Sequence, residues 1–172
     1  PFNRSTLPAQ AGRLEQSDGT AWMAMYCQDL LAVALVLAEH DETYEDMAIK
    51  FFEHFVLIAS ALNGKGLWDE DDGFYYDVLR PQGEPPRPVR ARSLVGLVPL
   101  LAVTTLGPET LGRLSEFTQR TEWFIHHKQQ AMDVVDHIHH PAHDGWRMLS
   151  IVSPDKLRRV LARMLDPEEF LS

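Results

Sequence analysis

Cysteine is almost absent from the sequence, in which Cys27 is the one such residue among 172. A single thiol cannot form an internal disulfide, so we expect a protein of a reducing, cytoplasmic compartment. Cys27 lies inside the most apolar stretch of the chain. We therefore expect its thiol to be buried and chemically inert.

Basic residues are scarce, with 16 Lys and Arg against 25 Asp and Glu and a formal net charge of -9. Binding to a phosphate backbone needs a basic surface, so we expect no nucleic-acid partner. The start of the sequence also lacks the basic and apolar segments of a secretory signal. Residues 21–38 are apolar enough to span a membrane, but Gln28 and Asp29 lie mid-stretch and acidic residues follow it. This pattern favours a core helix and no membrane partner.

Two long helices are predicted near the start of the chain. Residues 1–19 have no period, whereas 20–40 and 44–63 have apolar residues at helical spacing, and the short link between them predicts an antiparallel hairpin. The predicted apolar stripe of the first helix consists of Trp22, Tyr26, Leu30, Val33 and Leu37. Met23, Cys27, Leu31 and Ala34 widen it until little polar face remains, so this helix is predicted to be surrounded by other parts of the protein. The predicted stripe of the second consists of Met47, Phe51, Phe55, Ile58 and Leu62, with Phe52 and Val56 beside it.

The rest of the chain alternates loops with shorter predicted elements. Residues 64–91 are rich in Gly and Pro, so they predict a long excursion with a short strand at 74–79 and an exposed tip at 81–88. Further helices are predicted at 93–106, with a kink at Pro99, and at 108–128. A short strand is predicted at 146–152 and a final helix at 154–165, capped by Ser153. There is no internal repeat at a period of 33 to 47 residues.

Five segments together resemble the catalytic domain of the bacterial glucosidase-like branch of glycoside hydrolase family 63. They follow one another in order between residues 15 and 152: EQSDGTAWMAMY at 15–26, YEDMAIKFFEHF at 44–55, GLWDEDDGFYYD at 66–77, VRARSLVGLVPL at 89–100 and MLSIV at 148–152. The resemblance implies an all-α fold, in which antiparallel helical hairpins form part of an (α/α)6 toroid. Such a toroid needs about twice this length, so 1–172 is expected to be one partial domain completed by the remainder of a parent polypeptide.

The resemblance implies inverting hydrolysis of α-linked glucose or a related sugar, with a carbohydrate substrate and no cofactor. In the family the acid lies in a Leu-Asp-Asn motif upstream of a Phe-x-Arg-Ser segment, which residues 2–5 match, although Asn3 stands where an Asp is expected. The base lies in the C-terminal part of the toroid. Neither motif occurs in these 172 residues. The resemblance therefore implies pocket-lining roles for Gln16, Asp18 and Trp22 and no catalytic residue within the chain.

The start of the first helix is the main candidate site. Glu15 and Asp18 are paired carboxylates, the raw material of acid and base catalysis, and they are the weak catalytic candidates. There are two alternatives to catalysis. Ser17 or Asp18 caps the helix and has no other role, or it caps the helix and also binds a sugar. Aromatic and acidic residues at Trp68, Asp69 and Asp72 predict further sugar contacts, because indole faces and carboxylates suit sugar rings and hydroxyls. These groups are predicted to face one cavity.

Metal binding is not expected. Counted from Asp69, an EF-hand loop would need a ligand at its fifth position, where Gly73 stands. Arg90 and Arg92 are predicted to hold carboxylates of the acidic loop by forked pairs, a structural role. The histidine cluster allows either a zinc site or, as we favour, a solvated loop; its members are His126, His127, His137, His139, His140 and His143. The alternative function is a non-catalytic helical scaffold that binds protein.

Overall fold

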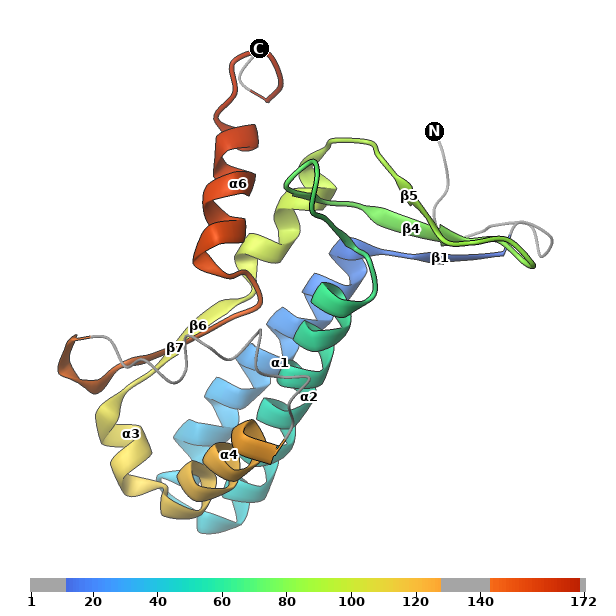
Figure 1. The fold of residues 1–172 in the computed structure, drawn as a ribbon. Coiled ribbons are helices and arrows are strands. Elements are labelled where there is room, and N and C mark those ends of the chain that lie inside the picture. Colours follow the sequence, from blue (N-terminus) through green and yellow to red (C-terminus); the bar gives the residue numbers. More distant parts are fainter. Residues whose placement is uncertain (1–11, 128–142, 171–172) are drawn as a thin grey trace.

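Two long antiparallel helices form the centre of the molecule (Figure 1). The computed structural model describes residues 12–127 and 143–170. Helix α1 (Ser17–Ala38) runs into a short 3-10 turn, η2 (Glu42–Tyr44), and α2 (Glu45–Gly64) returns beside it. Asp41 Oδ1 accepts a hydrogen bond of 3.0 Å from the Thr43 backbone N–H and closes the turn. The predicted hairpin is confirmed, since α1 and α2 pack along their lengths.

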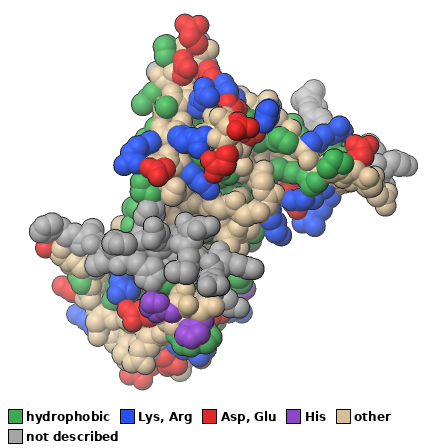
Figure 2. Space-filling model, in the orientation of Figure 1, with side chains coloured by type: hydrophobic (Ala, Val, Ile, Leu, Met, Phe, Trp, Pro, Cys, Tyr) green, Lys and Arg blue, Asp and Glu red, His purple; other side chains and the backbone are tan. Residues whose placement is uncertain are grey.

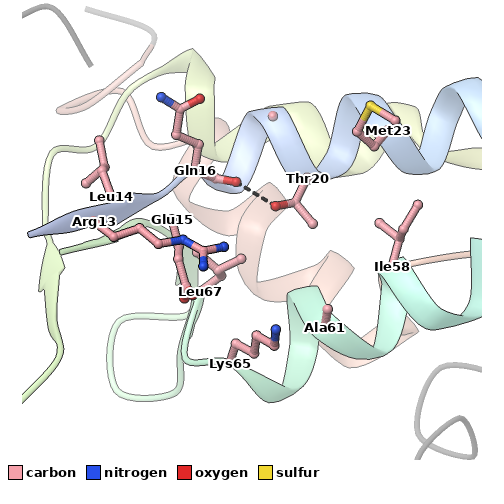
Figure 3. A pocket seen from close by; sticks show the side chains of 11 residues that line it. Arg13, Leu14, Glu15, Gln16, Thr20, Met23, Ile58, Ala61, Lys65 and Leu67 are labelled. Carbon is pink, nitrogen blue, oxygen red and sulfur yellow. Dashed lines mark hydrogen bonds between the residues drawn. The ribbon is translucent and has the colours of Figure 1, made fainter. Parts of the chain in front are cut away.

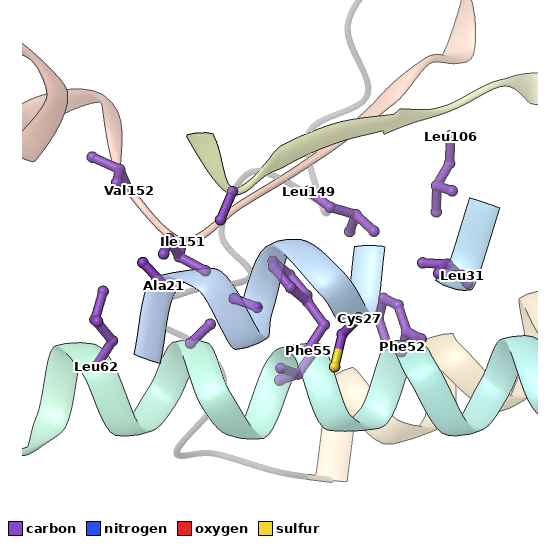
Figure 4. Close-up of a cluster of buried hydrophobic side chains, with 14 of the residues drawn as sticks. Ala21, Cys27, Leu31, Phe52, Phe55, Leu62, Leu106, Leu149, Ile151 and Val152 are labelled. Carbon is purple, nitrogen blue, oxygen red and sulfur yellow. The ribbon is translucent and has the colours of Figure 1, made fainter. Parts of the chain in front are cut away.

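Small residues on one face of each helix let the two backbones approach closely. Ala21, Ala24 and Ala34 of α1 are buried, as are Ala48 and Ala59 of α2. The large buried side chains come from both helices, from residues 74–76 and 149–151 and from residues 117–125. Figure 4 shows part of this core, with Phe52, Phe55, Leu62, Leu149 and Ile151 among its members. Burial of such apolar surface is the main stabilising term in folding.

Three small antiparallel sheets surround the hairpin within the described residues. One has the order β1 (Arg13–Glu15), β4 (Asp77–Arg80) and β5 (Arg87–Val89), with Glu15 opposite Val78. A second is the two-stranded ribbon of β2 (Trp68–Asp69) and β3 (Phe74–Tyr75). The third pairs β6 (Val103–Leu106) with β7 (Arg147–Ser150). The ribbon of β6 and β7 lies against α1, where Gln28 Nε2 donates to the Leu149 carbonyl at 3.0 Å.

The remaining elements are helical. They are η3 (Leu94–Leu101), α3 (Pro108–Arg113), α4 (Ser115–His127), η5 (His143–Gly145) and α6 (Pro154–Met164). Helix α4 packs on α2 through edge-to-face contacts of Phe52 with Phe117 and Phe124, at centroid distances of 6.1 and 6.4 Å. The buried Glu45 carboxylate of α2 accepts a 2.8 Å bond from the Phe117 N–H and so caps α4.

The prediction of an all-α fold and of an (α/α)6 toroid is wrong. About 59% of the described chain is helical and 15% is strand, so the fold is mixed α and β. Part of the reason lies in 103–106, where Val103, Thr104 and Thr105 favour an extended backbone that pairs with β7. The predicted helix at 93–106 is accordingly a 3-10 helix that ends at Leu101, followed by a strand.

Several other boundaries differ from the predictions. The helix predicted at 108–128 divides at Leu114, whose φ and ψ of -97° and 79° are not helical. The strand predicted at 74–79 divides into β3 and β4, and the one predicted at 146–152 is β7. The Ser153 cap is confirmed, since its Oγ accepts from the Lys156 N–H at 3.3 Å.

The main predicted stripe of the first helix is wrong, whereas Cys27, Leu31 and Ala34, which were predicted to widen it, are buried. All five members of the main stripe are exposed, from 39% for Trp22 to 56% for Tyr26. The buried face of α1 instead contains Ala21, Ala24, Cys27, Gln28, Leu31, Ala34, Leu35 and Ala38. The helix is apolar nearly all round, so periodicity does not tell which face packs on α2. In α2, Phe55 and Leu62 are buried as predicted, while Met47 is 40% exposed.

Candidate functional site

The N-terminal end of α1 is held by a carboxylate from another element. Gln16 occupies the N-cap position and makes no side-chain cap bond. Asp77, at the start of β4, accepts hydrogen bonds from the Ser17 N–H at 2.9 Å and from the Ser17 hydroxyl at 3.2 Å. The carboxylate thereby satisfies an unpaired amide and offsets the positive end of the helix dipole. The predicted capping by Ser17 or Asp18 is confirmed for Asp18, whose Oδ1 accepts from the first-turn Gly19 N–H at 2.7 Å, whereas the Ser17 hydroxyl donates to Asp77.

A pocket of about 470 Å³ opens beside this helix end (Figure 3). It lies between β1, the first two turns of α1 and the last two turns of α2. Polar groups come from Arg13, Glu15, Gln16, Thr20 and Lys65, and apolar groups from Leu14, Met23, Ile58, Ala61 and Leu67, with Gly19 between them. We call this the α1 pocket. An apolar floor with a few convergent polar groups is the usual composition of a small-molecule site.

Glu15 is fixed at the edge of the α1 pocket by an ion pair. Its Oε2 lies 2.8 Å from Arg80 Nε, and its side chain is 13% exposed. Arg80 also donates from Nη2 to the Lys65 carbonyl at 3.0 Å. The arginine thus joins β1 to the C-terminal end of α2, and this link sets the separation of the two polar walls.

The predicted site residues do not all meet at this pocket. Glu15 and Gln16 line it, whereas Asp18 and Trp22 are not among its lining residues. The loop at 66–77 contributes Leu67 in place of its acidic and aromatic groups. Glu15 and Asp18 are therefore not brought together over one cavity, although Glu15 ends β1 and Asp18 lies in the first turn of α1. Figure 1 shows this end of the helical hairpin, where β1 leads into α1.

Trp68 is a packed side chain with 7% exposure. Its ring meets Tyr75 edge-on at a centroid distance of 4.8 Å. Two cations of α6 lie over it, with Lys156 Nζ at 5.1 Å and Arg159 Cζ at 5.2 Å. These contacts attach α6 to the β2–β3 ribbon through cation–π attraction. The indole face that would stack on a sugar is thus occupied by side chains of this chain.

Asp69 and Asp72 order the acidic loop through contacts within it and with two arginines. Asp69 Oδ1 accepts from the Asp72 N–H at 3.0 Å, and Asp69 Oδ2 lies 2.8 Å from Arg90 Nη2. Asp72 pairs with Arg92 and accepts from the Tyr76 hydroxyl. The predicted pairing of Arg90 and Arg92 with carboxylates of this loop is confirmed.

A larger charge cluster extends from Asp72 to α6 and the C-terminal segment. Arg163 Nε donates to the Asp72 carbonyl at 3.2 Å, and Arg92 also pairs with Glu169. Basic and acidic side chains accordingly gather around α6 in Figure 2. The Arg92 hydrogen bond, then the Tyr76 hydroxyl, lower the pKa of the Asp72 carboxyl. Burial and the Asp72 bond raise the pKa of Tyr76.

No group suited to a metal ion lies in residues 12–127 and 143–170, where three or more His, Cys, Asp or Glu side chains never converge. Three of the six histidines of the predicted cluster, His137, His139 and His140, lie at 128–142, outside the described residues. Of the others, His127 stacks on Trp123 at a centroid distance of 4.4 Å. Cys27 is buried as predicted, and burial raises the pKa of its thiol.

Helix α1 is long and apolar enough to cross a membrane, and 44% of its most apolar window is buried inside the protein. It is the one helix with that property in the part of the chain that the structure describes. Its contacts with α2, η3 and the β6–β7 ribbon are those of a core helix.

Most of the residues that line the pocket were not predicted from the sequence, among them Arg13, Thr20, Met23, Ile58 and Lys65. Two of them had a signal in the sequence, because Gln16, Thr20 and Met23 are separated by four and three residues and so share one helix face. Lys65 is brought opposite them by the antiparallel return of α2. The predicted hairpin therefore implied that Lys65 lies opposite Thr20 and Met23. The predicted site instead included residues of the acidic loop.

Comparisons with known proteins identify one relative of unstated function. No protein-family model matches the chain, and no solved structure matches it. The chain is 37% identical, over an alignment of 188 positions, to a Saccharomyces cerevisiae protein named "Uncharacterized protein YMR196W". The alignment covers 99% of this chain and 17% of the relative. The chain thus spans about a sixth of the length of the relative that it matches.

Proposed function

We propose that this chain forms one wall of a sugar-binding site in a glycoside hydrolase that resembles family 63 and acts on α-linked glucose or a related sugar. The observation that supports this most directly is the α1 pocket, whose polar groups surround an apolar floor at the end of the helix where the resembling segment 15–26 begins. A pyranose presents both hydroxyls and an apolar ring face, and it fits such a lining.

Each lining group has a defined task in the proposed site. The Glu15 carboxylate is held in place by Arg80 and accepts from a sugar hydroxyl. The amide of Gln16 and the ammonium of Lys65 supply further polar contacts from opposite walls. Met23, Ile58 and Leu67 cover the apolar face of the ring. Gly19 keeps the space beside Gln16 open, because a Cβ there would stand 3.2 Å from Gln16 Oε1.

The proposed wall does not supply the chemistry of hydrolysis. An inverting glycosidase needs a carboxylic acid and a carboxylate on opposite sides of the scissile bond. The Leu-Asp-Asn motif of the family does not occur in the sequence, and the α1 pocket is lined by one carboxylate, Glu15. The rest of a longer polypeptide would supply the acid and base and would complete the site.

Maltose binding tests this proposal, with cellobiose as the β-linked comparison and saturation-transfer NMR as the readout. We expect millimolar binding of maltose and a loss of roughly fivefold in affinity for Gln16→Ala, because one hydrogen bond contributes about 1 kcal/mol. Gln119→Ala is the matched control, since Gln119 lies on α4 outside the α1 pocket. Equal affinity of the wild type and of Gln16→Ala would refute the proposed site.

Turnover distinguishes the wall from a complete enzyme. We expect no release of glucose from maltose by this chain, because both proton-transfer groups of the family are missing from it. Dose-dependent glucose release, abolished by Glu15→Gln, would instead identify Glu15 as a catalytic residue.

A further inference from the structure

An apolar stripe runs along the face of α1 that α2 leaves uncovered. Each member has between 39% and 62% of its surface exposed: Trp22, Met23, Tyr26, Leu30, Val33, Val36 and Leu37. At about 100° per residue, these side chains occupy an arc of roughly 140° and a length of about 22 Å. We call this surface the α1 stripe. Contiguous apolar patches of that extent are uncommon on monomeric proteins and mark an interface.

The spacing of the α1 stripe is that of a helix-packing seam. Trp22, Tyr26, Asp29, Val33 and Val36 follow one another at intervals of four, three, four and three residues. This alternation keeps one line of side chains facing a second helix, in which each side chain fits a hole between four others. We propose that the α1 stripe is covered by an α-helix from outside these 172 residues, in the same polypeptide.

Asp29 decides against a second copy of the chain. It is exposed and lies at the middle of the α1 stripe. A two-fold axis through the stripe would pair α1 with itself, in either direction, and would bring one Asp29 against the other. Two carboxylates buried together repel each other and lose their hydration. The covering helix therefore has a basic side chain opposite Asp29.

The same residue decides against a lipid surface. A carboxylate in the middle of a lipid-facing stripe is costly, and helices that lie on membranes are rich in Lys and Arg on their flanks. The residues beside this stripe are acidic, with Asp18 before it and Glu39, Asp41 and Glu42 after it. They would be repelled by anionic lipid.

The relative's length indicates where the covering helix comes from. The match takes in 99% of this chain but 17% of the yeast protein, so most of that polypeptide lies outside the matched region. A covalently attached helix has a high effective concentration at the stripe and competes well against separate partners. This inference does not rest on the proposed sugar site, because the α1 stripe and the α1 pocket share only Met23.

Site-specific photo-cross-linking tests the inference in the polypeptide expressed from its own complete gene. A benzophenone side chain replaces Val33, which is 55% exposed, and mass spectrometry locates the cross-link. The matched control is the same side chain at Leu165, which is 59% exposed and lies at the end of α6. We expect Val33 to cross-link within one polypeptide to a single segment outside residues 1–172, with apolar residues every three or four positions.

A second variant checks the charge argument. Asp29→Lys should lower the cross-linked fraction at Val33 several-fold, whereas Asp18→Lys should leave it unchanged. Cross-links to another copy, to lipid or to residues within 1–172 would overturn the inference. A yield at Val33 no greater than that at Leu165 would overturn it as well.

Discussion

Replacement of Asp77 by Ala tests whether the N-terminal end of α1 is held by a distant carboxylate. In the structure, Asp77 is 9% exposed and accepts bonds from both the backbone N–H and the hydroxyl of Ser17. The substitution leaves the buried Ser17 groups without this acceptor and removes negative charge from the positive end of the helix. It also frees the first turn of α1 from β4.

The expected loss is about 2 to 3 kcal/mol of unfolding free energy. Hydrogen bonds to a charged acceptor contribute about 1.5 to 3 kcal/mol, and loss of an N-cap contact costs about 0.5 to 2 kcal/mol. The two values describe overlapping contacts, so they do not add in full. For a protein of this size, the loss corresponds to a fall in Tm of about 4 to 12 °C. Asp77→Asn keeps an acceptor oxygen and should lose about 1 kcal/mol.

Urea unfolding at neutral pH, followed by far-UV circular dichroism, measures these changes. The midpoint should fall while the m-value stays constant, because the area exposed on unfolding is the same. Asp71→Ala is the matched control, since Asp71 is an exposed carboxylate on the neighbouring loop and should change stability by less than about 0.5 kcal/mol. An effect of Asp77→Ala no larger than that of Asp71→Ala would refute the capping argument. The double variant with Ser17→Ala should show a coupling of at least about 0.5 kcal/mol.

Three further variants probe other contacts by the same assay. Phe55→Ala should cost about 3 to 5 kcal/mol, because Phe55 is 0% exposed in the core between the helices; a cost below about 1 kcal/mol would contradict that packing. Gly96→Ala should cost at least about 1 to 3 kcal/mol, since a Cβ would stand 2.2 Å from Phe74 Cε1 and 2.5 Å from the Tyr75 carbonyl, and an unchanged midpoint would contradict it. The charged Asp72 carboxylate stabilises the folded protein, because the pKa of this group is lower in the folded state than its value of 3.8 in the unfolded state. The difference between wild type and Asp72→Asn should therefore stay constant above about pH 5 and shrink as pH falls through 4, and a difference that grows in acid would reverse this sign.

The helical hairpin could be predicted because its signal is local. Residues 17–38 and 45–64 are long apolar segments joined by a polar turn, and a connection that short forces the second helix back along the first. The pairing of Arg90 and Arg92 with the acidic loop was predictable for a similar reason. Two guanidinium groups close in sequence to a run of carboxylates have few other partners of opposite charge.

Two of the three sheets were harder to predict from the sequence, because each contains a pair of strands that are distant in sequence. Strand β1 has three residues and pairs with a strand more than 60 residues away, and β6 pairs with a strand that begins at Arg147. Neither strand is long enough to show an alternating pattern. The capping role of Asp77 depends on the first of these pairings, since Glu15 opposite Val78 is what brings Asp77 next to Ser17. No local rule reveals a cap supplied in this way.

Two of the residues predicted to bind or act on a substrate line the α1 pocket, and the others do not. Glu15 and Gln16 were identified from their position before an apolar helix, and they line the α1 pocket. Trp68 was assigned to sugar binding because aromatic and acidic residues cluster around it. Its cation–π partners Lys156 and Arg159 come from α6, almost 90 residues away. The residue type and its neighbours in the sequence therefore suggested that Trp68 binds a sugar, whereas contacts with residues distant in the sequence give it a packing role.

The wrong prediction of the buried face of α1 has a different cause. The helix is apolar nearly all round, and this pattern was interpreted without asking which part of the protein covers each face. Apolar residues on all sides of a helix predict that every face is covered. In the described residues, α2, η3 and the β6–β7 ribbon cover one side, and Trp22, Tyr26, Val33 and their neighbours remain exposed. A helix selected only for this packing would have polar residues on that side, as α4 has at Glu116, Gln119 and Arg120. The exposed apolar residues of α1 thus form the α1 stripe, the surface that we propose a further helix covers.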